Sequence, residues 1–368
     1  MTHQPFATLR RTLGPFIEPL YRFEINRRNA RYDLLIGVHS LPLPVISVGN
    51  LTTGGTGKTP FVVWLCSGLM AAGRRPLIAM RGYKANATGQ SDEAELYRRL
   101  LPGVPVVANP RRFAAVTRWL AQHPGAADCV VLDDGFQHRK VRRDCDIVLL
   151  DATVDLSAER MLPTGNLRES VKGLARADLI VITHAEAVQG PLAAGTHWSG
   201  PLLTRLGRTT DAVASHVWHG LRDAQGVLHP PSDLQGKRVL AVCAIGNPAA
   251  FVRQVQIAVG VEATPQATAE SGPASEQSPK SREVCSIVLP DHDPYLPPTI
   301  ERIIREAAAM NANMIVTTAK DFTKLGREIV NPDRWPAPLM VAELGLSVSG
   351  GDELLAKVLG SLGTPTPN

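Results

Sequence analysis

The sequence predicts an α/β fold in which a parallel sheet carries helices on both faces. Short apolar runs rich in β-branched residues alternate with stretches long enough for crossover helices. The runs are continuously apolar rather than alternating, which is typical of strands buried on both faces of a parallel sheet. The predicted strands cover residues 45–48, 77–80, 104–107, 129–132, 147–150 and 179–183.

A glycine-rich loop follows the first predicted strand. It ends in Gly57-Lys58-Thr59, and an apolar stretch at 61–65 then continues as the buried part of a helix. Strand, glycine loop, Lys-Thr and helix in this order predict a P-loop NTPase-like sheet. Thr52 stands where the standard pattern has its first glycine, so the glycines that follow must supply the turn. The alternative is a tight turn that binds no nucleotide.

The loop should hold a nucleotide through several kinds of group. Backbone N–H groups and the helix N-terminus face the phosphates, Lys58 reaches the β- and γ-phosphates, and the Thr59 hydroxyl binds Mg²⁺. The residues expected to bind the nucleotide are Thr53, Gly54, Gly55, Thr56, Gly57, Lys58, Thr59 and Pro60.

Two carboxylates, Asp133 and Asp134, follow the apolar run 129–132. Acidic residues at the end of a buried strand are the usual partner of a P-loop and hold Mg²⁺ directly or through water. By themselves they would more often cap a helix, but beside a glycine-rich loop the metal-binding role is favoured. Mg²⁺ takes few carboxylates and keeps several waters, so one of the two should be the closer ligand. The sequence leaves open which one.

Composition limits the possible partners. With 368 residues, 44% of them hydrophobic, the chain is long enough for two α/β domains. A net charge of +5 suits an anionic ligand or membrane surface. No RNP-like or zinc-finger pattern occurs, so we expect no nucleic-acid partner. The 5 cysteines have no C-x-x-C spacing, which indicates reduced core residues in a cytosolic protein.

The domain organisation follows from changes in composition along the chain. We expect an N-terminal amphipathic helix over residues 1–35, as part of a P-loop domain that continues over 36–211. Residues 212–238 contain two short β-like runs around a glycine turn and predict a hairpin linker. A smaller second α/β domain is expected over 239–368, with a mobile insertion rich in Ser, Pro, Ala and Gln at 264–281.

The N-terminal helix combines an apolar stripe with arginines. No segment reaches the roughly 18 continuous apolar residues of a membrane span, and no signal-peptide pattern occurs. The helix could lie in a membrane interface or pack on its own domain with a solvated basic face. The apolar residues are Phe6, Leu9, Leu13, Phe16, Ile17, Leu20, Tyr21 and Phe23, and the arginines are Arg10, Arg11, Arg22, Arg27, Arg28 and Arg31.

Eight short motifs follow one another along nearly the whole chain. They are Thr53-Gly-Gly-Thr-Gly-Lys-Thr-Pro60, Arg81-Gly-Tyr83, Ser91-Asp-Glu93, Asp133-Asp-Gly-Phe-Gln-His138, Leu162-Pro-Thr-Gly165 with Arg168-Glu169, Ile245-Gly-Asn-Pro248, Asp291-His292 and Thr318-Ala-Lys-Asp321. In this order they resemble the motifs of the tetraacyldisaccharide 4′-kinase family.

The resemblance implies ATP-dependent phosphorylation of the 4′-hydroxyl of a tetraacylated glucosamine disaccharide 1-phosphate in lipid A biosynthesis. It also implies ATP and Mg²⁺ as cofactors. A peripheral position on the cytoplasmic face of the bacterial inner membrane is implied as well, which favours membrane contact for residues 1–35.

The resemblance also assigns roles to individual positions. Asp92 matches the family's proposed general base, and His292 matches the histidine paired with it. Lys58 would join them as a catalytic residue by offsetting charge on the transferring group. The positions expected near the sugar and phosphate of the lipid are Tyr83, Arg112 and Arg168.

A ParA/MinD-like, membrane-associated regulatory ATPase is the alternative from another class. Proteins of that kind share the Gly-Gly-x-Gly-Lys-Thr loop, but they place a lysine immediately before it. Thr53 occupies that position here, which favours the kinase.

Overall fold

The computed structural model describes residues 7–82, 92–188, 197–246, 248–260, 284–290, 293–325 and 334–363. The chain forms two compact units, Met1–His216 with Leu346–Asn368, and Val217–Gly345. The composition of the chain predicts a second domain over residues 239–368, whereas the C-terminal segment groups with the first unit. The reason is that α9 (Gly351–Leu362) buries Leu354 and Val358 in the same core as α2 (Lys58–Ala71).

The first unit is built on a parallel sheet with the strand order β3-β2-β4-β1-β5-β6-β7. The predicted α/β class with a parallel sheet is therefore confirmed, and β6 has the expected bounds. The strands are β1 (Val45–Asn50), β2 (Pro76–Met80), β3 (Val106–Ala108), β4 (Cys129–Asp133), β5 (Cys145–Asp151), β6 (Leu179–Thr183) and β7 (Ala212–Arg222).

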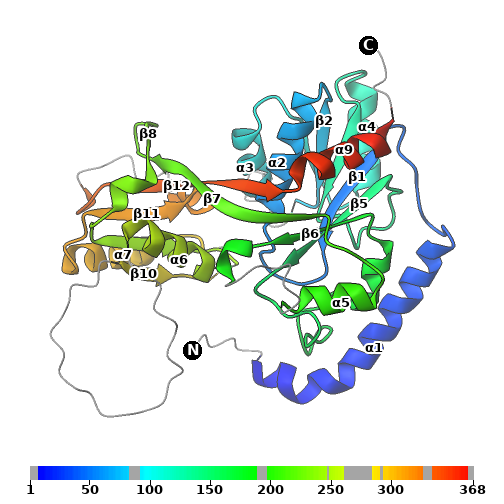
Figure 1. Cartoon of the computed structure of the whole chain (residues 1–368), viewed down its shortest axis with the longest axis horizontal. Helices are drawn as coiled ribbons and strands as arrows, with labels where there is room; N and C mark the ends of the chain where they lie inside the picture. Colours follow the sequence, from blue (N-terminus) through cyan, green and yellow to red (C-terminus); the bar gives the residue numbers. More distant parts are fainter. Residues whose placement is uncertain are drawn as a thin grey trace. The chain divides into compact units, whose positions relative to one another are not determined.

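Alternate strand residues enter different cores because successive side chains in a strand point to opposite faces. Ile147 and Leu149 of β5 pack with α2, α3 and α9, whereas Val148 and Leu150 pack with α1, α5 and η1. Figure 1 shows these two groups of helices on opposite sides of the central strands. The remaining helices of this unit are α1 (Ala7–Asp33), α3 (Asp92–Leu100), α4 (Arg112–Gln122), η1 (Val171–Arg176), η2 (Ala185–Ala187) and α5 (Ser199–Arg205).

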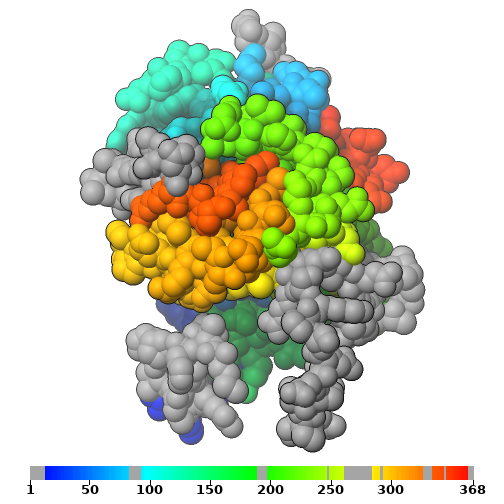
Figure 2. All heavy atoms as spheres, turned by 90° about the vertical axis from the view of Figure 1, so that its left-hand side faces the viewer, coloured from blue at the N-terminus to red at the C-terminus, as the bar shows by residue number. Residues whose placement is uncertain are grey.

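The second unit has a smaller sheet in the order β10-β9-β11-β12-β7. Buried Asp321 ties together the ends of β9 and β11, because its Oδ2 accepts hydrogen bonds from Ala244 N (3.0 Å) and Thr318 Oγ1 (2.7 Å). Figure 2 looks onto this unit, where the green atoms of β7 lie beside the orange atoms of β12. Its further elements are β9 (Val239–Cys243), α6 (Pro248–Val259), β10 (Val284–Val288), α7 (Pro297–Ala309), β11 (Met314–Thr318), α8 (Ala319–Leu325), β12 (Leu339–Ser349) and η3 (Pro231–Leu234).

The expected hairpin is present. β7 pairs antiparallel with β8 (Leu228–His229), and the Asp223 carboxylate closes the turn by accepting from Gln225 N and Val227 N. The main chain leaves the first unit within β7 and returns within β12. Both strands therefore connect the units, rather than a linker alone.

Some sequence predictions lie outside the described residues. These are the insertion at 264–281, Tyr83 and His292, and the side chain of Asp92 at the start of α3 is likewise not described. All 5 cysteines are free thiols, and burial raises the pKa of Cys66 to about 12. Within the described ranges, no helix has both the length and the apolar character needed to cross a membrane.

Candidate functional site

The glycine-rich loop joins the end of β1 to the start of α2. Gly57 caps α2 in the left-handed conformation (φ 71°), and Gly54 also has a positive φ of 124°. Side chains with a Cβ rarely adopt such angles, so these two glycines make the turn. Thr52, which replaces the first glycine of the usual pattern, is buried and bridges to Leu167 of a neighbouring loop. Thr52 does not have a positive φ, so its backbone conformation does not require glycine.

Lys58 opens α2 and extends toward the ends of the neighbouring strands. Its Nζ donates to Oδ1 of Asn50 (3.2 Å) and lies 3.6 Å from Oδ1 of Asp134. Asn50 ends β1, and its Nδ2 donates to the carbonyl oxygen of Thr52 (2.9 Å). The lysine charge is therefore held beside the loop by a strand-end amide and a carboxylate.

Asp133 ends β4, next to β1 in the sheet. The residue is only 6% exposed, and none of the described residues gives its Oδ1 a hydrogen bond of good geometry, although the Tyr97 hydroxyl lies beside the carboxylate. Burial and the neighbouring Asp134 carboxylate raise the pKa of Asp133. The buried hydroxyl of Tyr97 lies beside the Asp133 carboxylate and the Thr59 hydroxyl, and burial together with the charge of Asp133 raises its pKa well above the usual value.

A buried, unbalanced carboxylate oxygen suits a hard divalent cation such as Mg²⁺, which prefers oxygen ligands. The Asp134 carboxylate differs from that of Asp133 because two cations, Arg168 and Lys58, already lie beside it. Arg168 Nη1 lies 2.8 Å from both of its carboxylate oxygens. Burial alone would raise the pKa of Asp134, but the charges of Lys58 and Arg168 outweigh burial and lower it. Of the pair, Asp133 is therefore the better candidate for a metal ligand.

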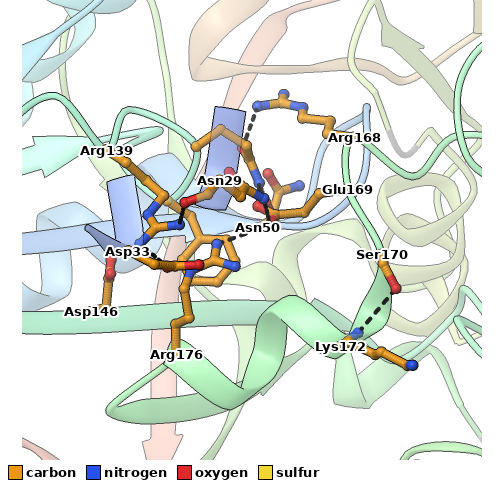
Figure 3. A network of polar contacts seen from close by, with 12 residues as sticks. Asn29, Asp33, Asn50, Arg139, Asp146, Arg168, Glu169, Ser170, Lys172 and Arg176 are labelled. Carbon is orange, nitrogen blue, oxygen red and sulfur yellow. Dashed lines mark hydrogen bonds and ion pairs between the residues drawn. The ribbon is translucent and has the colours of Figure 1, made fainter. Parts of the chain in front are cut away.

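Glu169 organises a second polar cluster next to this site. It is 2% exposed, and its carboxylate accepts hydrogen bonds from Gln137 Nε2 (3.0 Å), Arg176 Nη2 (2.9 Å) and Asn29 Nδ2 (3.2 Å). Figure 3 shows Asn29, Glu169 and Arg176 converging in this network. Glu169 belongs to one of the motifs that carry the family resemblance, but its sequence position gives it no role. A buried charged group has to be paired, so the role of Glu169 follows only once its burial is known.

Arg112 supports the acidic turn from α4. It is 3% exposed, and its Nη1 donates to the main-chain carbonyl of Asp134 (3.0 Å). Burial lowers its pKa, although Asp134 and Asp133 oppose that effect. Burial and the charge of Arg112 lower the pKa of His138 to about 4, so this histidine is neutral near neutral pH. Contact between Arg112 and a substrate stays a prediction.

Two histidines that no sequence motif singled out lie against the loop. His184 and His216 stack with ring centroids 4.8 Å apart, and a Cβ at Gly57 would lie 3.5 Å from Cε1 of His216. Their Nδ1 atoms lie 3.0 Å from carboxylate oxygens of Asp151 and Glu186, respectively. Isolated histidines at the end of β6 and within β7 give no signal in one sequence, because only the fold brings them together.

The strand, glycine-rich loop and helix, with a lysine at the helix start and a carboxylate ending the adjacent strand, define the class of P-loop proteins. Comparison with known proteins refines this class. The family model described as "Tetraacyldisaccharide-1-P 4'-kinase" matches residues 9–269. The chain therefore belongs to the tetraacyldisaccharide 4′-kinase family.

Relatives named tetraacyldisaccharide 4′-kinase are similar over most of their length. The protein from Halothermothrix orenii is 30% identical, covering 85% of this chain and 82% of its own. The protein from Bdellovibrio bacteriovorus is 31% identical, and the match covers 89% of this chain and 93% of that protein. Among solved structures, LpxK from Aquifex aeolicus in complex with ATP matches with a TM-score of 0.68 and 29% identity, covering 96% of this chain and 99% of that one.

Proposed function

We propose that this protein transfers the γ-phosphoryl group of ATP to the 4′-hydroxyl of a tetraacylated glucosamine disaccharide 1-phosphate, a step of lipid A biosynthesis. The cluster of Lys58, Asp134 and Arg168 beside the glycine loop carries the proposal, together with family membership. A loop of this kind suits a triphosphate, and the solved relative from Aquifex aeolicus was obtained with ATP.

Lys58 and the loop N–H groups would bind the triphosphate and offset charge on the transferring group. Asp133 and the hydroxyl of Thr59 would hold Mg²⁺. The buried Oδ1 of Asp133, which has no hydrogen bond of good geometry from the described residues, supports that role. Mg²⁺, when bound, would neutralise charge on the phosphate oxygens. Asp134 would orient Lys58 and Arg168, since it already contacts both.

Other roles rest on the family resemblance and are part of the proposal. Asp92 would accept the proton of the 4′-hydroxyl, because a sugar hydroxyl is a weak nucleophile and must lose that proton during transfer. His292 would tune this base. Tyr83, Arg112 and Arg168 would lie near the sugar and phosphate of the lipid, where arginine can contact phosphate through two N–H groups.

Helix α1 would bring the enzyme to its lipid substrate at the cytoplasmic face of the inner membrane. Its large apolar side chains include Phe16 (77% exposed), Leu20 (70%) and Phe23 (68%), with Leu13 and Ile17 also exposed. A cluster of exposed apolar side chains on one helix, accompanied by arginines, suits a membrane interface. We propose peripheral attachment through this surface.

The deciding experiment measures transfer from γ-labelled ATP, with Mg²⁺, to the tetraacyl disaccharide 1-phosphate in detergent micelles. We expect label in the lipid with the wild type and none with Lys58→Ala. Lys172→Ala, which changes an exposed lysine away from the loop, should behave like the wild type. Phosphate release that depends on Lys58 but not on the lipid would favour the regulatory ATPase instead.

A further inference from the structure

Helix α1 has a second face that points toward its own unit. Glu18 and Ile25 are buried there, and Tyr21 and Asn29 are half-buried. These positions recur every three or four residues, which is the spacing of one helical face. The side chains proposed to meet lipid lie elsewhere on the same helix. The helix therefore contacts protein with one face and leaves another free.

Among the described residues, most side-chain bonds of the inward face go to the loop 160–169. Arg139 adds a contact at the C-terminal end of the helix, where its Nη1 donates to Asn29 O (3.1 Å). Tyr21 Oη donates to the carbonyl oxygen of Arg168 (2.9 Å), and Asn29 Nδ2 donates to Oε2 of Glu169 (3.2 Å). Glu18 lies 3.0 Å from Arg160 Nη2, at the other end of the loop. The helix thus contacts both ends of the loop with polar bonds.

On the side away from α1, the loop 160–169 is bonded to the glycine-rich loop that follows β1. Arg168 N donates to Leu51 O (2.8 Å), and Thr53 N donates to Asn166 O (2.8 Å). Arg168 therefore has its main-chain N–H fixed by the end of β1, its carbonyl fixed by Tyr21 and its side chain on Asp134. Losing one of the two main-chain bonds would let the guanidinium move away from Asp134.

We propose that Tyr21 and Asn29 of α1 are positioning residues that hold Arg168 and Glu169 at the phosphate site. The inference rests on the proposed phosphoryl transfer for the role of that site. Tyr21 acts through the main chain of Arg168, and Asn29 acts through the buried carboxylate of Glu169. The helix that meets the lipid surface thereby also supports the reaction centre. A helix that serves only for attachment would need neither bond.

The test compares Tyr21→Phe and Asn29→Ala with Glu24→Gln, a control on the same helix whose exposed side chain pairs with Arg27. Tyr21→Phe keeps the ring and removes one hydrogen bond. A single hydrogen bond of this kind contributes a modest free energy. If its loss misplaces Arg168 in the transition state by that amount of free energy, kcat in detergent micelles should fall about threefold to tenfold. The KM for ATP should stay near the wild-type value, and Glu24→Gln should keep wild-type kinetics.

A double-mutant cycle with Arg168→Lys separates positioning from general loss of stability. Residues that act through one another are not additive. If Tyr21 acts through Arg168, then Tyr21→Phe should have little further effect on kcat in the Arg168→Lys background. Fully additive effects, or a Tyr21→Phe enzyme with wild-type kcat, would overturn the proposal. Faster hydrogen exchange of the peptide covering 160–169 in Tyr21→Phe would support it independently.

Attachment is measured separately, by cosedimentation with vesicles of phosphatidylethanolamine and phosphatidylglycerol. Tyr21→Phe should bind these vesicles like the wild type, whereas Phe16→Ser combined with Leu20→Ser should bind less. If Tyr21→Phe lost vesicle binding but kept kcat in detergent, α1 would serve attachment alone and the inference would fail. A wild type that transfers no phosphate to the lipid would instead refute the proposed function.

Discussion

Nη1 of Arg168 lies 2.8 Å from both carboxylate oxygens of Asp134, and Oδ1 of Asp134 also lies 3.6 Å from Nζ of Lys58. One carboxylate thus orders two cations, one at the start of α2 and the other in the loop 160–169. Pre-ordered charge is effective in phosphoryl transfer because little reorganisation remains for the transition state. In the proposed reaction, Asp134 therefore serves the two cations rather than the metal.

Replacing Arg168 by alanine should lower kcat/KM for lipid phosphorylation by about tenfold to a hundredfold, the scale expected for losing hydrogen bonds to a charged group. Lys58 remains to bind ATP, so the KM for ATP should change less. Steady-state kinetics of label transfer measure both quantities. Arg118→Ala removes an exposed arginine from α4 and serves as the control. Wild-type kcat/KM in Arg168→Ala would exclude a role for this side chain.

Replacing Asp133 by asparagine should stabilise the nucleotide-free protein while abolishing transfer. The raised pKa of Asp133 reflects the cost of a buried negative charge beside Asp134, and asparagine removes that charge at nearly the same size. We expect the free energy of unfolding to rise by on the order of 1 kcal/mol. Thermal melts without Mg²⁺ measure the first effect and the label assay the second. A less stable Asp133→Asn protein would contradict this account.

Gly57 should tolerate alanine poorly for two separable reasons. Its φ of 71° is strained for any residue with a Cβ, which costs about 1–2 kcal/mol. Its backbone also belongs to the loop proposed to bind nucleotide. Gly73 has a similar φ of 78° with nothing near the position of a Cβ. In thermal melts, Gly73→Ala should therefore lose about as much stability as Gly57→Ala. Gly73→Ala should keep wild-type ATP affinity, whereas Gly57→Ala should lose both stability and ATP affinity.

Asp151 should contribute to stability only at higher pH. Burial would raise its pKa, but the hydrogen bond and charge of His184 outweigh burial and lower it. The folded protein then binds this proton less readily than the unfolded chain. The stabilisation is present above the unfolded pKa of about 4 and disappears as pH falls through the lower folded value.

Asp151→Asn tests this pH dependence. At pH 7 it should destabilise the fold by about 1–3 kcal/mol, and the difference from the wild type should shrink on acidification toward about pH 3. Urea unfolding at several pH values measures the difference. Asp352→Asn changes an exposed carboxylate and serves as the control. Its free energy of unfolding should differ little from that of the wild type. A constant difference at all pH values would rule out ionisation of Asp151 as the cause.

The strands and the phosphate loop could be predicted because their signals are local. Continuous apolar runs are needed for burial on both faces, and only glycine readily adopts the angles found at Gly54 and Gly57. The boundary between the two units could not be predicted in the same way, because it depends on contacts between distant parts of the chain. The segment Leu346–Asn368 looked like part of the second domain because it follows that domain in sequence. Its apolar face instead packs on α2, a contact that a single sequence does not reveal.

The sequence by itself determined the α/β class, the glycine loop with Lys58, and the acidic pair that ends β4, because each depends on residues adjacent in the chain. Only the tertiary structure distinguished Asp133 from Asp134. Their sequence environments are nearly the same, but Arg168, far along the chain, pairs with Asp134, whereas burial and the charge of Asp134 raise the pKa of Asp133. Burial and charge pairing depend on three-dimensional neighbours, so the structure also decided that Tyr21 and Asn29 bond to the loop beside the site.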